Sequence, residues 1–545
     1  MSKNVNKKLI MRIKRVFTVL LFALLPFVAT AQVVVSGSGR DVEQSLRKFN
    51  QFFYYLDALY VDTVDHSSVT EEAIRAVLAE LDPHSAYVTA EEMVGVEEEF
   101  SGSFSGVGIE FDILNDTLSV VSTIAGGPSE QLGMVAGDKI IAIDSESAIG
   151  ITQNDVRKRL RGPKGSVVEI DVVRRGMKEP LRFRVVRDDI PIETVDAAYQ
   201  IAPNIGYVKV NRFADNTMDE LREAINKTGA TEGLILDLRA NGGGLLTQAV
   251  EMGSFFLPAG CEVVSIEGRS VPKTRYGSEL AGDYSKPRLV VLIDSSSASA
   301  SEIVSGAVQD WDRGVLIGQP TYGKGLVQRQ IPLSDNSAVR ITVAHYYTPS
   351  GRAIQRPYEN GKAEEYYIDH VRRSVDEHYR DSVNQNLPAY RTLNSGRTVY
   401  GGGGVEPDLY IPIDTTRNFA YWSALSGAGV INELVNVYLD EERGRLERRY
   451  PTFEAFVEGY SLPDDFQQRL IDLGEERGVA YNPDKVGNSL SDTAYLLKAL
   501  VARKLWGTTE YYRIVHANED PELDMAIEVI YSPERYYELL APPAE

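Results

Sequence analysis

The chain has 545 residues, which is too many for one ordinary domain and suggests about three or four. Hydrophobic residues make up 43% and charged residues 25%, the balance of a soluble globular protein. The net charge of −21 argues against nucleic acid or anionic membranes as main partners. The single cysteine, Cys261, cannot form an internal disulfide, and no Cys/His spacing suits a structural zinc site.

Residues 1–31 have the pattern of a secretory signal peptide. A basic segment over residues 3–15 precedes an apolar stretch over residues 16–29, and Ala29-Thr30-Ala31 matches the small-x-small cleavage pattern. We expect cleavage after Ala31 and export to the periplasm or cell envelope. The alternative is an uncleaved membrane anchor, although a span needs about 20 mostly apolar residues and this stretch is shorter.

The next segment, residues 40–98, is predicted to be a small helical domain. Apolar residues recur at helical spacing over residues 44–60 and again over residues 70–81. The sequence Leu81-Asp-Pro-His-Ser85 then ends the second helix, because proline and its preceding residue disfavour helix.

Residues 99–187 change to short strands separated by glycines. The segments 118–121, 139–144, 167–173 and 181–186 read as strands, and residues 156–160 fit a short helix. We expect a separate domain with its own core.

Residues 188–415 alternate between strands and helices, which predicts a mixed β-sheet with covering helices. Residues 355–400 are polar and irregular, which suggests an insertion. Residues 416–545 read as a helical domain without recognisable chemistry. The expected fold class is therefore α/β with several domains.

The serine-rich segment 294–303 joins a buried strand to a helix. A serine at such a junction presents its hydroxyl at the sheet edge, beside helix amides that can hold an oxyanion. The plainer interpretation is a serine that only caps the helix.

A nucleophilic serine needs a base, and two candidates follow it. His345 lies in an alternating strand, where a packing role is the common one. Lys324 lies between two glycines and could act if burial lowered its pKa toward about 7–8. Gln328 could orient that amine only across a bend, because an extended chain would separate the two by about 13 Å.

A glycine-rich loop, Asn241-Gly-Gly-Gly244, follows another buried strand and opens a helix. Its backbone amides could face an anion, but a plain tight turn would look the same.

Together these segments resemble the carboxy-terminal processing (tail-specific) proteases over roughly residues 40–415. The Ser and Lys segments stand in the family's order, 25 residues apart. The matching pieces are Ser297-Ala-Ser-Ala-Ser-Glu-Ile303, Thr321-Tyr-Gly-Lys-Gly325 with Gln328, Leu236-Asp-Leu-Arg-Ala-Asn-Gly-Gly-Gly244, Tyr346-Tyr-Thr-Pro-Ser-Gly-Arg352, Gly404-Val-Glu-Pro-Asp408 and Leu81-Asp-Pro-His-Ser85.

The resemblance implies a serine endopeptidase that forms an acyl-enzyme without metal or cofactor. Ser299 would be the nucleophile, Lys324 the general base and Gln328 the residue that orients Lys324. The oxyanion hole would use backbone amides of Gly243, Gly244 and Ala300.

The resemblance also implies a PDZ domain over residues 99–187, inserted between the N-terminal helical domain and a Ser/Lys protease core over residues 188–415. The peptide carboxylate would bind at Gly106, Val107, Gly108 and Ile109. Arg161 resembles a conformational sensor, with a plain turn residue as the alternative. The expected partners are exported polypeptides with unstructured C-termini, and homo-oligomerisation is left open.

Two other functions fit the same residues. One is a PDZ scaffold with a proteolytically inert core. The other is a peptidase that acts on cell-wall peptides.

Overall fold

The computed structural model describes residues 39–542, apart from residues 115, 125, 175, 415–418, 487–488 and 519. The predicted signal peptide lies outside the described residues. The chain divides into two compact units between Ala73 and Ile74, inside the segment predicted as one N-terminal helical domain. Within the described residues, no helix combines the length and apolar character that a membrane crossing requires.

The first unit contains α2 (Gly39–Leu59) and the beginning of α3 (His66–Ala79). The ring of Phe53 packs 5.5 Å from Phe49 and 6.1 Å from His66, measured between centroids. The His66 imidazole also lies 2.9 Å from the Asp57 carboxylate. The apolar spacing over residues 44–60 therefore forms the helix that it predicted.

The second unit begins with the end of α3, β1 (Ala86–Val88) and α4 (Ala90–Ser101). A two-stranded stem of β2 (Ser103–Gly106) and β9 (Asp188–Pro191) leads into and out of a separate antiparallel sheet. The strand order of that sheet is β3-β4-β5-β7-β8, with β6 beside β5. Its elements are β3 (Ile109–Leu114), β4 (Thr117–Thr123), α5 (Pro128–Gln131), β5 (Lys139–Ile143), β6 (Glu146–Ser147), α6 (Gln153–Leu160), β7 (Val167–Val173) and β8 (Leu181–Val186).

This sheet has its own hydrophobic core, in which Leu118, Ile140 and Val156 have no exposed surface. Strand β3 ends the sheet and pairs only with β4 among the described strands. Its other edge therefore has no strand partner in the described part of the chain, as an edge that accepts an added strand requires.

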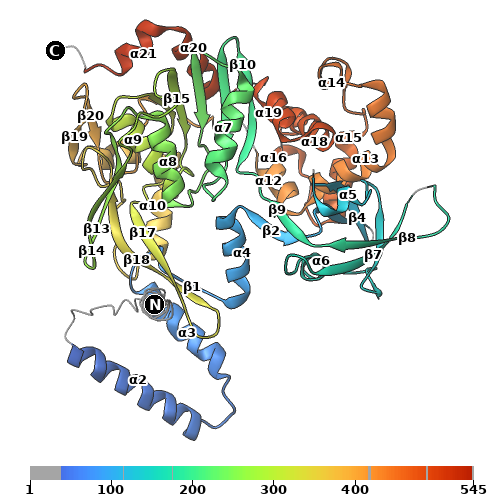
Figure 1. The fold of residues 1–545 in the computed structure, drawn as a ribbon, viewed down its shortest axis with the longest axis horizontal. Helices are drawn as coiled ribbons and strands as arrows, with labels where there is room; N and C mark the ends of the chain where they lie inside the picture. Colours follow the sequence, from blue (N-terminus) through green and yellow to red (C-terminus); the bar gives the residue numbers. More distant parts are fainter. Residues whose placement is uncertain are drawn as a thin grey trace, which may run out of the picture. The chain divides into compact units, whose positions relative to one another are not determined.

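The central sheet, of which Figure 1 labels β10 and β15, has the order β10-β11-β12-β15-β16-β21. All neighbours from β11 onward are parallel, and β10 is antiparallel to β11. Every residue of β11 and β12 is buried, which explains their continuous apolar runs. The strands are β10 (Val195–Ala202), β11 (Ile205–Val210), β12 (Gly233–Asp237), β15 (Arg288–Ile293), β16 (Val315–Gly318) and β21 (Leu409–Tyr410).

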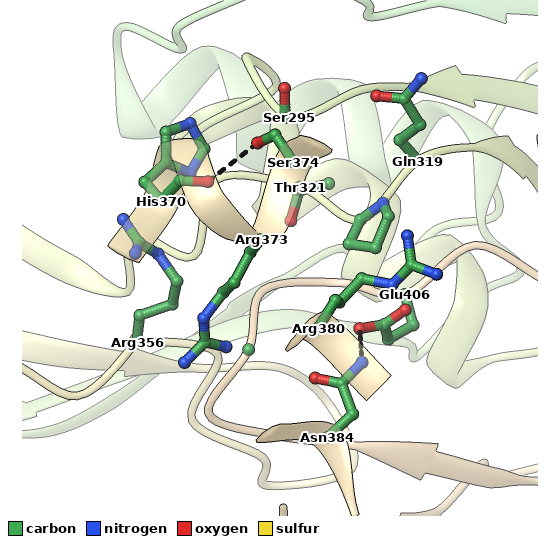
Figure 2. Close-up of a pocket in the computed structure, with 12 residues that line it drawn as sticks. Ser295, Gln319, Thr321, Arg356, His370, Arg373, Ser374, Arg380, Asn384 and Glu406 are labelled. Carbon is green, nitrogen blue, oxygen red and sulfur yellow. Dashed lines mark hydrogen bonds between the residues drawn. The ribbon is translucent and has the colours of Figure 1, made fainter. Parts of the chain in front are cut away.

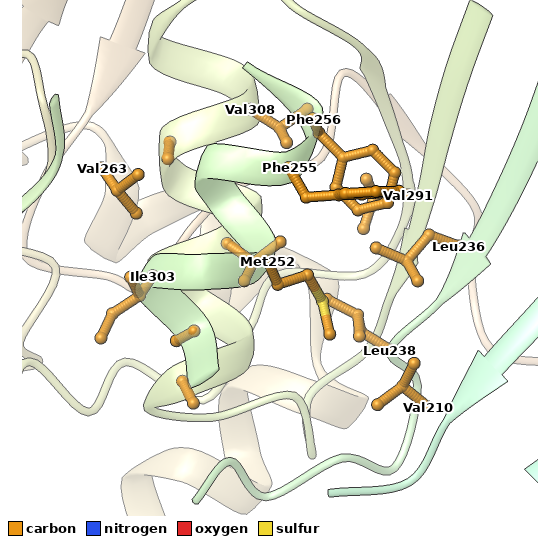
Figure 3. Packing of buried hydrophobic residues seen from close by; sticks show 14 of the residues in the cluster. Val210, Leu236, Leu238, Met252, Phe255, Phe256, Val263, Val291, Ile303 and Val308 are labelled. Atoms are coloured by element: carbon orange, nitrogen blue, oxygen red, sulfur yellow. The ribbon is translucent and has the colours of Figure 1, made fainter. Parts of the chain in front are cut away.

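Helices α7 (Thr217–Thr228), α8 (Leu246–Phe256) and α9 (Ala300–Asp310) cover one face of this sheet. Figure 3 shows Met252 and Phe256 of α8 packed among Leu236, Val291 and Val308. Each fully buried side chain of this kind contributes about 1.5–3 kcal/mol. The packing fixes the start of α9 against the ends of the strands.

The second face is covered by the C-terminal helices α20 (Pro521–Tyr531) and α21 (Pro533–Leu539) (Figure 1). Val529 and Ile530 of α20 pack against Ile235, Val290 and Leu292, and all five are fully buried. The end of the region predicted as a separate helical domain thus forms a layer on the central sheet.

The other C-terminal helices have a core of their own. They also contact the sheet of β3 to β8, where Asn436 donates to Asp112 at 2.6 Å and Lys504 lies 3.4 Å from Glu110. These helices are α12 (Ala420–Gly427), α13 (Val430–Arg449), α14 (Phe453–Gly459), α15 (Phe466–Glu476), α16 (Pro483–Val486), α17 (Ser489–Asp492), α18 (Ala494–Trp506) and α19 (Thr508–His516).

A further sheet, with the order β1-β18-β13-β14 and β17 beside β18, carries the segment that follows Lys324. The strands of this sheet that have not yet been given are β13 (Glu262–Gly268), β14 (Val271–Gly277), β17 (Leu326–Pro332) and β18 (Ala338–Tyr347).

The predicted insertion over residues 355–400 is less irregular than expected, since it contains two helices and a hairpin. They are α10 (Ala363–Val375), α11 (Glu377–Asn384), and the hairpin of β19 (Ala389–Arg391) and β20 (Thr398–Tyr400).

Candidate active site

Ser299 occupies the N-cap position of α9, at the carboxyl end of β15. Its φ of 55° lies in the left-handed region, which costs about 1–3 kcal/mol for a residue with a Cβ and persists only when the surroundings enforce it. Ser299 lines a pocket of about 700 Å³ together with Gly244, Ala300, Lys324 and Gln328. The structure therefore brings the predicted nucleophile, base and orienting residue to one cavity.

The glycine loop lies against Ser299 because neither Gly243 nor Gly244 has a side chain. A Cβ on Gly243 would lie 2.8 Å from the Ser299 Cβ, and a Cβ on Gly244 would lie 2.0 Å from the Phe213 carbonyl oxygen. Both residues also have positive φ, 100° and 146°. Only glycine lets this backbone come so close to the serine.

The three amides predicted for the oxyanion hole are not equivalent. The Gly243 amide donates to the Asn241 Oδ1 at 2.9 Å, so it is already engaged. The amides of Gly244 and Ala300 donate to no acceptor in the described part of the chain. Ala300 is the first residue of α9, where amides lack partners within the helix.

Asn241 joins the glycine loop to the serine segment, a role that the sequence analysis missed. Its carbonyl oxygen accepts from the Ala298 amide at 3.0 Å and from the Ser301 hydroxyl at 2.9 Å. Its side-chain amide donates to the Val210 carbonyl at 2.9 Å. A buried Asn with all these bonds fixes the separation of the two segments, because leaving any one unmade is costly.

Lys324 and Gln328 lie side by side, as their predicted cooperation required. The Lys324 Nζ donates to the Gln328 Oε1 at 3.1 Å. The bend that allows this comes from the irregular residues before β17 and from a register shift between Val327 and Gln328. The Gln328 side-chain amide donates in turn to the His84 carbonyl at 2.5 Å, which fixes its orientation.

The pKa of Lys324 is lowered below its ordinary value near 10.5, first by burial and then by the nearby Arg340 guanidinium. The carboxylates of Glu302 and Asp82 act in the opposite direction. A neutral amine is therefore more accessible here than on a surface lysine. In the described structure the amine donates to Gln328, and no hydrogen bond joins it to Ser299.

Glu302 holds the serine and lysine segments together. Its fully buried carboxylate accepts from the Ser299 amide at 2.8 Å, from the Lys324 and Gly323 amides at 2.9 and 2.7 Å, and from the Thr321 hydroxyl at 2.6 Å. Burial raises its pKa to about 7, although all four donors favour the ionised form. The sequence signal was a Glu three residues after a serine at a helix start, which is typical of a capping box.

The segment Leu81 to Ser85 supports Gln328 from outside the central sheet. Asp82 accepts from the amides of His84 and Ser85, both at 2.9 Å, and from the Thr342 hydroxyl at 3.1 Å. This ties the His84 carbonyl to β18. His345, the other candidate base, is exposed on β18 and does not line the pocket.

A second pocket lies beyond the Lys324 segment (Figure 2). Its lining includes Thr321, Arg356, His370 and Glu406, and it contains neither Ser299 nor Lys324. Ser299 and Lys324 therefore line the larger cavity and not this one.

The predicted carboxylate loop, Gly106 to Ile109, connects β2 to β3. Gly108 has a φ of 74°, and the Val107 carbonyl accepts from the Ser129 hydroxyl at 2.6 Å. Arg161 ends α6, forms an ion pair with Glu98 of α4, and lies 4.6 Å from the centroid of the Phe104 ring. It therefore joins the separate sheet's helix to α4.

Comparison with known proteins gives three family matches along the chain. Residues 204–361 match the model of peptidase family S41, residues 119–174 match the PDZ domain, and residues 421–507 match a family of unknown function, DUF8443.

A carboxy-terminal-processing protease of Bartonella bacilliformis is 38% identical over 335 residues, which cover 60% of this chain and 76% of that protein. The carboxy-terminal processing protease CtpA of Bacillus subtilis is 31% identical, over 63% of this chain and 75% of that one. The solved photosystem II D1 C-terminal processing protease aligns with a TM-score of 0.33 and 31% identity, over 56% and 83% of the two chains.

The family match and these relatives identify the α/β core as that of a serine-type peptidase, with a PDZ domain beside it. The chain belongs to the carboxy-terminal processing proteases of peptidase family S41.

Proposed function

We propose that the protein cleaves polypeptides through an acyl-enzyme, with Ser299 as the nucleophile and Lys324 as the general base. The supporting observation is that both residues line one pocket, with the amine of Lys324 buried beside Gln328. The free amides of Gly244 and Ala300 lie in the same pocket and are suited to stabilise an oxyanion.

Hydrogen bonding explains how a lysine can serve as the base. A neutral amine donates one N–H to the Gln328 oxygen and keeps its lone pair for the proton of the Ser299 hydroxyl. As that proton moves to Lys324, the Ser299 Oγ bonds to the carbonyl carbon of the substrate. The leaving amine then takes the proton, and water releases the acyl group by the reverse sequence.

We further propose that the PDZ domain selects the C-terminal ends of exported proteins. The open edge of β3 offers unpaired backbone groups, and the loop from Gly106 to Ile109 lies at its start. A peptide can add there as a strand, with its terminal carboxylate held by loop amides. The signal-like pattern of residues 1–31 supports export of the enzyme itself.

Digestion of an unfolded polypeptide with a free C-terminus tests this function. We expect Ser299→Ala and Lys324→Ala each to abolish cleavage while peptide binding, followed by fluorescence anisotropy, persists. Cleavage that survives both substitutions would refute the assignment. Wild-type protein that binds the peptide without cutting it would instead indicate an inert scaffold.

A further inference from the structure

A set of buried charges joins the C-terminal region to the strand that precedes the glycine loop. Arg239 follows β12, and its guanidinium lies between two carboxylates. It donates to Asp237 at 2.8 Å, and its two terminal nitrogens each donate to Asp520 at 3.0 Å. Asp520 lies 281 residues further along the chain and caps the start of α20. Such bidentate pairing fixes the direction of a guanidinium as well as its position.

Two cations and three carboxylates meet in this set. Arg239 faces Asp237, Asp520 and Glu522, and Lys209 lies 3.5 Å from Asp237. The side chains of Asp237, Asp520 and Arg239 are 1%, 12% and 18% exposed, so an unpaired charge here would be costly. Glu522 lies 3.5 Å from Arg239 as an ion pair, whereas Asp520 accepts two hydrogen bonds from it at 3.0 Å and is the closer partner.

The position of Arg239 fixes the backbone of the residues that follow it, Ala240 and Asn241. Ala240 has a φ of 56°, a conformation that a residue with a Cβ adopts only when its neighbours enforce it. The Ala240 amide donates to both oxygens of Asp294 at 3.0 Å, and Asn241 then makes its bonds to the serine segment. Arg239 therefore fixes the start of the loop that carries Gly244, at the end of the loop that joins β12.

We propose that Asp520 is a positioning residue for the peptidase reaction. Through Arg239, it holds the loop that presents the Gly244 amide to the oxyanion. The proposal rests on the proposed role of Gly244 and Ala300. It gives the end of the C-terminal region a part in catalysis without contact to the substrate.

The substitution Asp520→Asn keeps the shape of the side chain and removes its charge. Loss of an oxyanion donor costs about 10²–10³ in kcat, so a displaced donor should cost about 10-fold. We expect kcat to fall by that factor while KM for a tail peptide stays unchanged. Affinity for a peptide boronate, which mimics the tetrahedral state, should fall by the same factor.

Asp524→Asn is the matched control, because Asp524 is exposed on the same helix and is not a partner of Arg239 in the described structure. It should leave kcat and boronate affinity unchanged. A purely structural role of Asp520 would lower the thermal midpoint and leave kcat of the folded enzyme unchanged, which would overturn the proposal.

A double-substitution cycle tests the path through Arg239. If Asp520 acts through that residue, adding Asp520→Asn to Arg239→Gln should change kcat little further. Independent, multiplying effects would contradict the proposed path. If wild-type enzyme cleaves and Ser299→Ala does not, a normal kcat for Asp520→Asn refutes this inference alone. Cleavage by Ser299→Ala would refute the proposed function instead.

Discussion

The peptidase segments and the C-terminal helices contact the same central sheet, but they contribute to it in different ways. The Ser299 and Lys324 segments follow β15 and β16 and are short. The Ser299 amide donates to Glu302, three residues further on, and the Lys324 amine donates to Gln328, four residues further on. Helices α20 and α21 lie across its second face and place apolar side chains on β12 and β15. Short local motifs therefore identify the Ser299 and Lys324 segments, whereas the start of α20 reaches the central sheet at Arg239 from 281 residues further along the chain.

Gly244→Ala should show the largest loss of kcat, and it tests the role of the active-site segments rather than that of the C-terminal helices. The added Cβ would lie 2.0 Å from the Phe213 carbonyl oxygen, so the loop must move away from Ser299. We expect kcat of the folded protein to fall by about 10²–10³ or more, as for the loss of an oxyanion donor, and the thermal midpoint to fall as well, because alanine is strained at this position. Steady-state kinetics on a tail peptide measure this.

Gly242→Ala is the control in the same loop, since a Cβ there meets nothing within 4 Å. It should cost far less activity than Gly244→Ala. Equal losses for the two substitutions would mean that the loop does not depend on the close approach at Gly244.

Ile530→Ala should lower the stability of the protein while leaving the activity of the folded protein nearly unchanged. Ile530 is fully buried against the sheet, so its truncation should lower the free energy of unfolding by about 2–5 kcal/mol. Activity per folded molecule should be nearly unchanged, because Ile530 does not contact the Arg239 set. Urea unfolding together with kinetics measures both quantities.

The exposed Tyr537 on α21 provides the comparison, and Tyr537→Ala should change stability by less than about 0.5 kcal/mol. Unchanged stability for Ile530→Ala would contradict the account of α20 as a layer of the core.

Glu302→Gln should lower both the stability and the kcat of the enzyme. An amide has one acceptor oxygen and adds an N–H that would face the amides of Ser299, Gly323 and Lys324. We expect a loss of about 1–3 kcal/mol in stability and a lower kcat, because buried donors lose their partner. Thermal unfolding and kcat measured on the same preparation test this, and a wild-type kcat would show that Glu302 does not set the geometry of the pair.

The smallest effect concerns the pH dependence of cleavage. Lys324 acts as a base only when deprotonated, so kcat/KM should fall as the pH drops below its pKa, which lies under 10.5. Arg340 lowers that pKa, so Arg340→Gln should raise it and move the acidic limb to higher pH.

Arg329→Gln is the control for charge on the same hairpin, because Arg329 is exposed and does not line the pocket. Its profile should match the wild type. A shift toward lower pH for Arg340→Gln would contradict the sign of the effect.

Much of the fold followed from the sequence because its signals are local. Apolar runs at β12 and β15 predicted buried strands, and glycine spacing predicted the separate PDZ sheet. The family's order of Ser and Lys segments singled out Ser299, Lys324 and Gln328, and the structure gathers all three in one pocket. The signal peptide and the predicted domain limits stay predictions.

The remaining features depend on contacts between distant segments, which no local pattern reports. Nothing near Asp520 predicts a partner at Arg239, and nothing near His84 predicts that its carbonyl orients Gln328. The engagement of the Gly243 amide by Asn241 also needed the folded loop. Hydrogen bonds between segments that meet only in the folded chain leave no local pattern in the sequence.

Reaction with a fluorophosphonate, followed by peptide mass spectrometry, tests the central claim most directly. The account predicts one adduct, on Ser299, that forms with wild-type protein and is lost or strongly slowed in Lys324→Ala. An adduct on a different serine, or cleaving enzyme that never becomes labelled at Ser299, would contradict it.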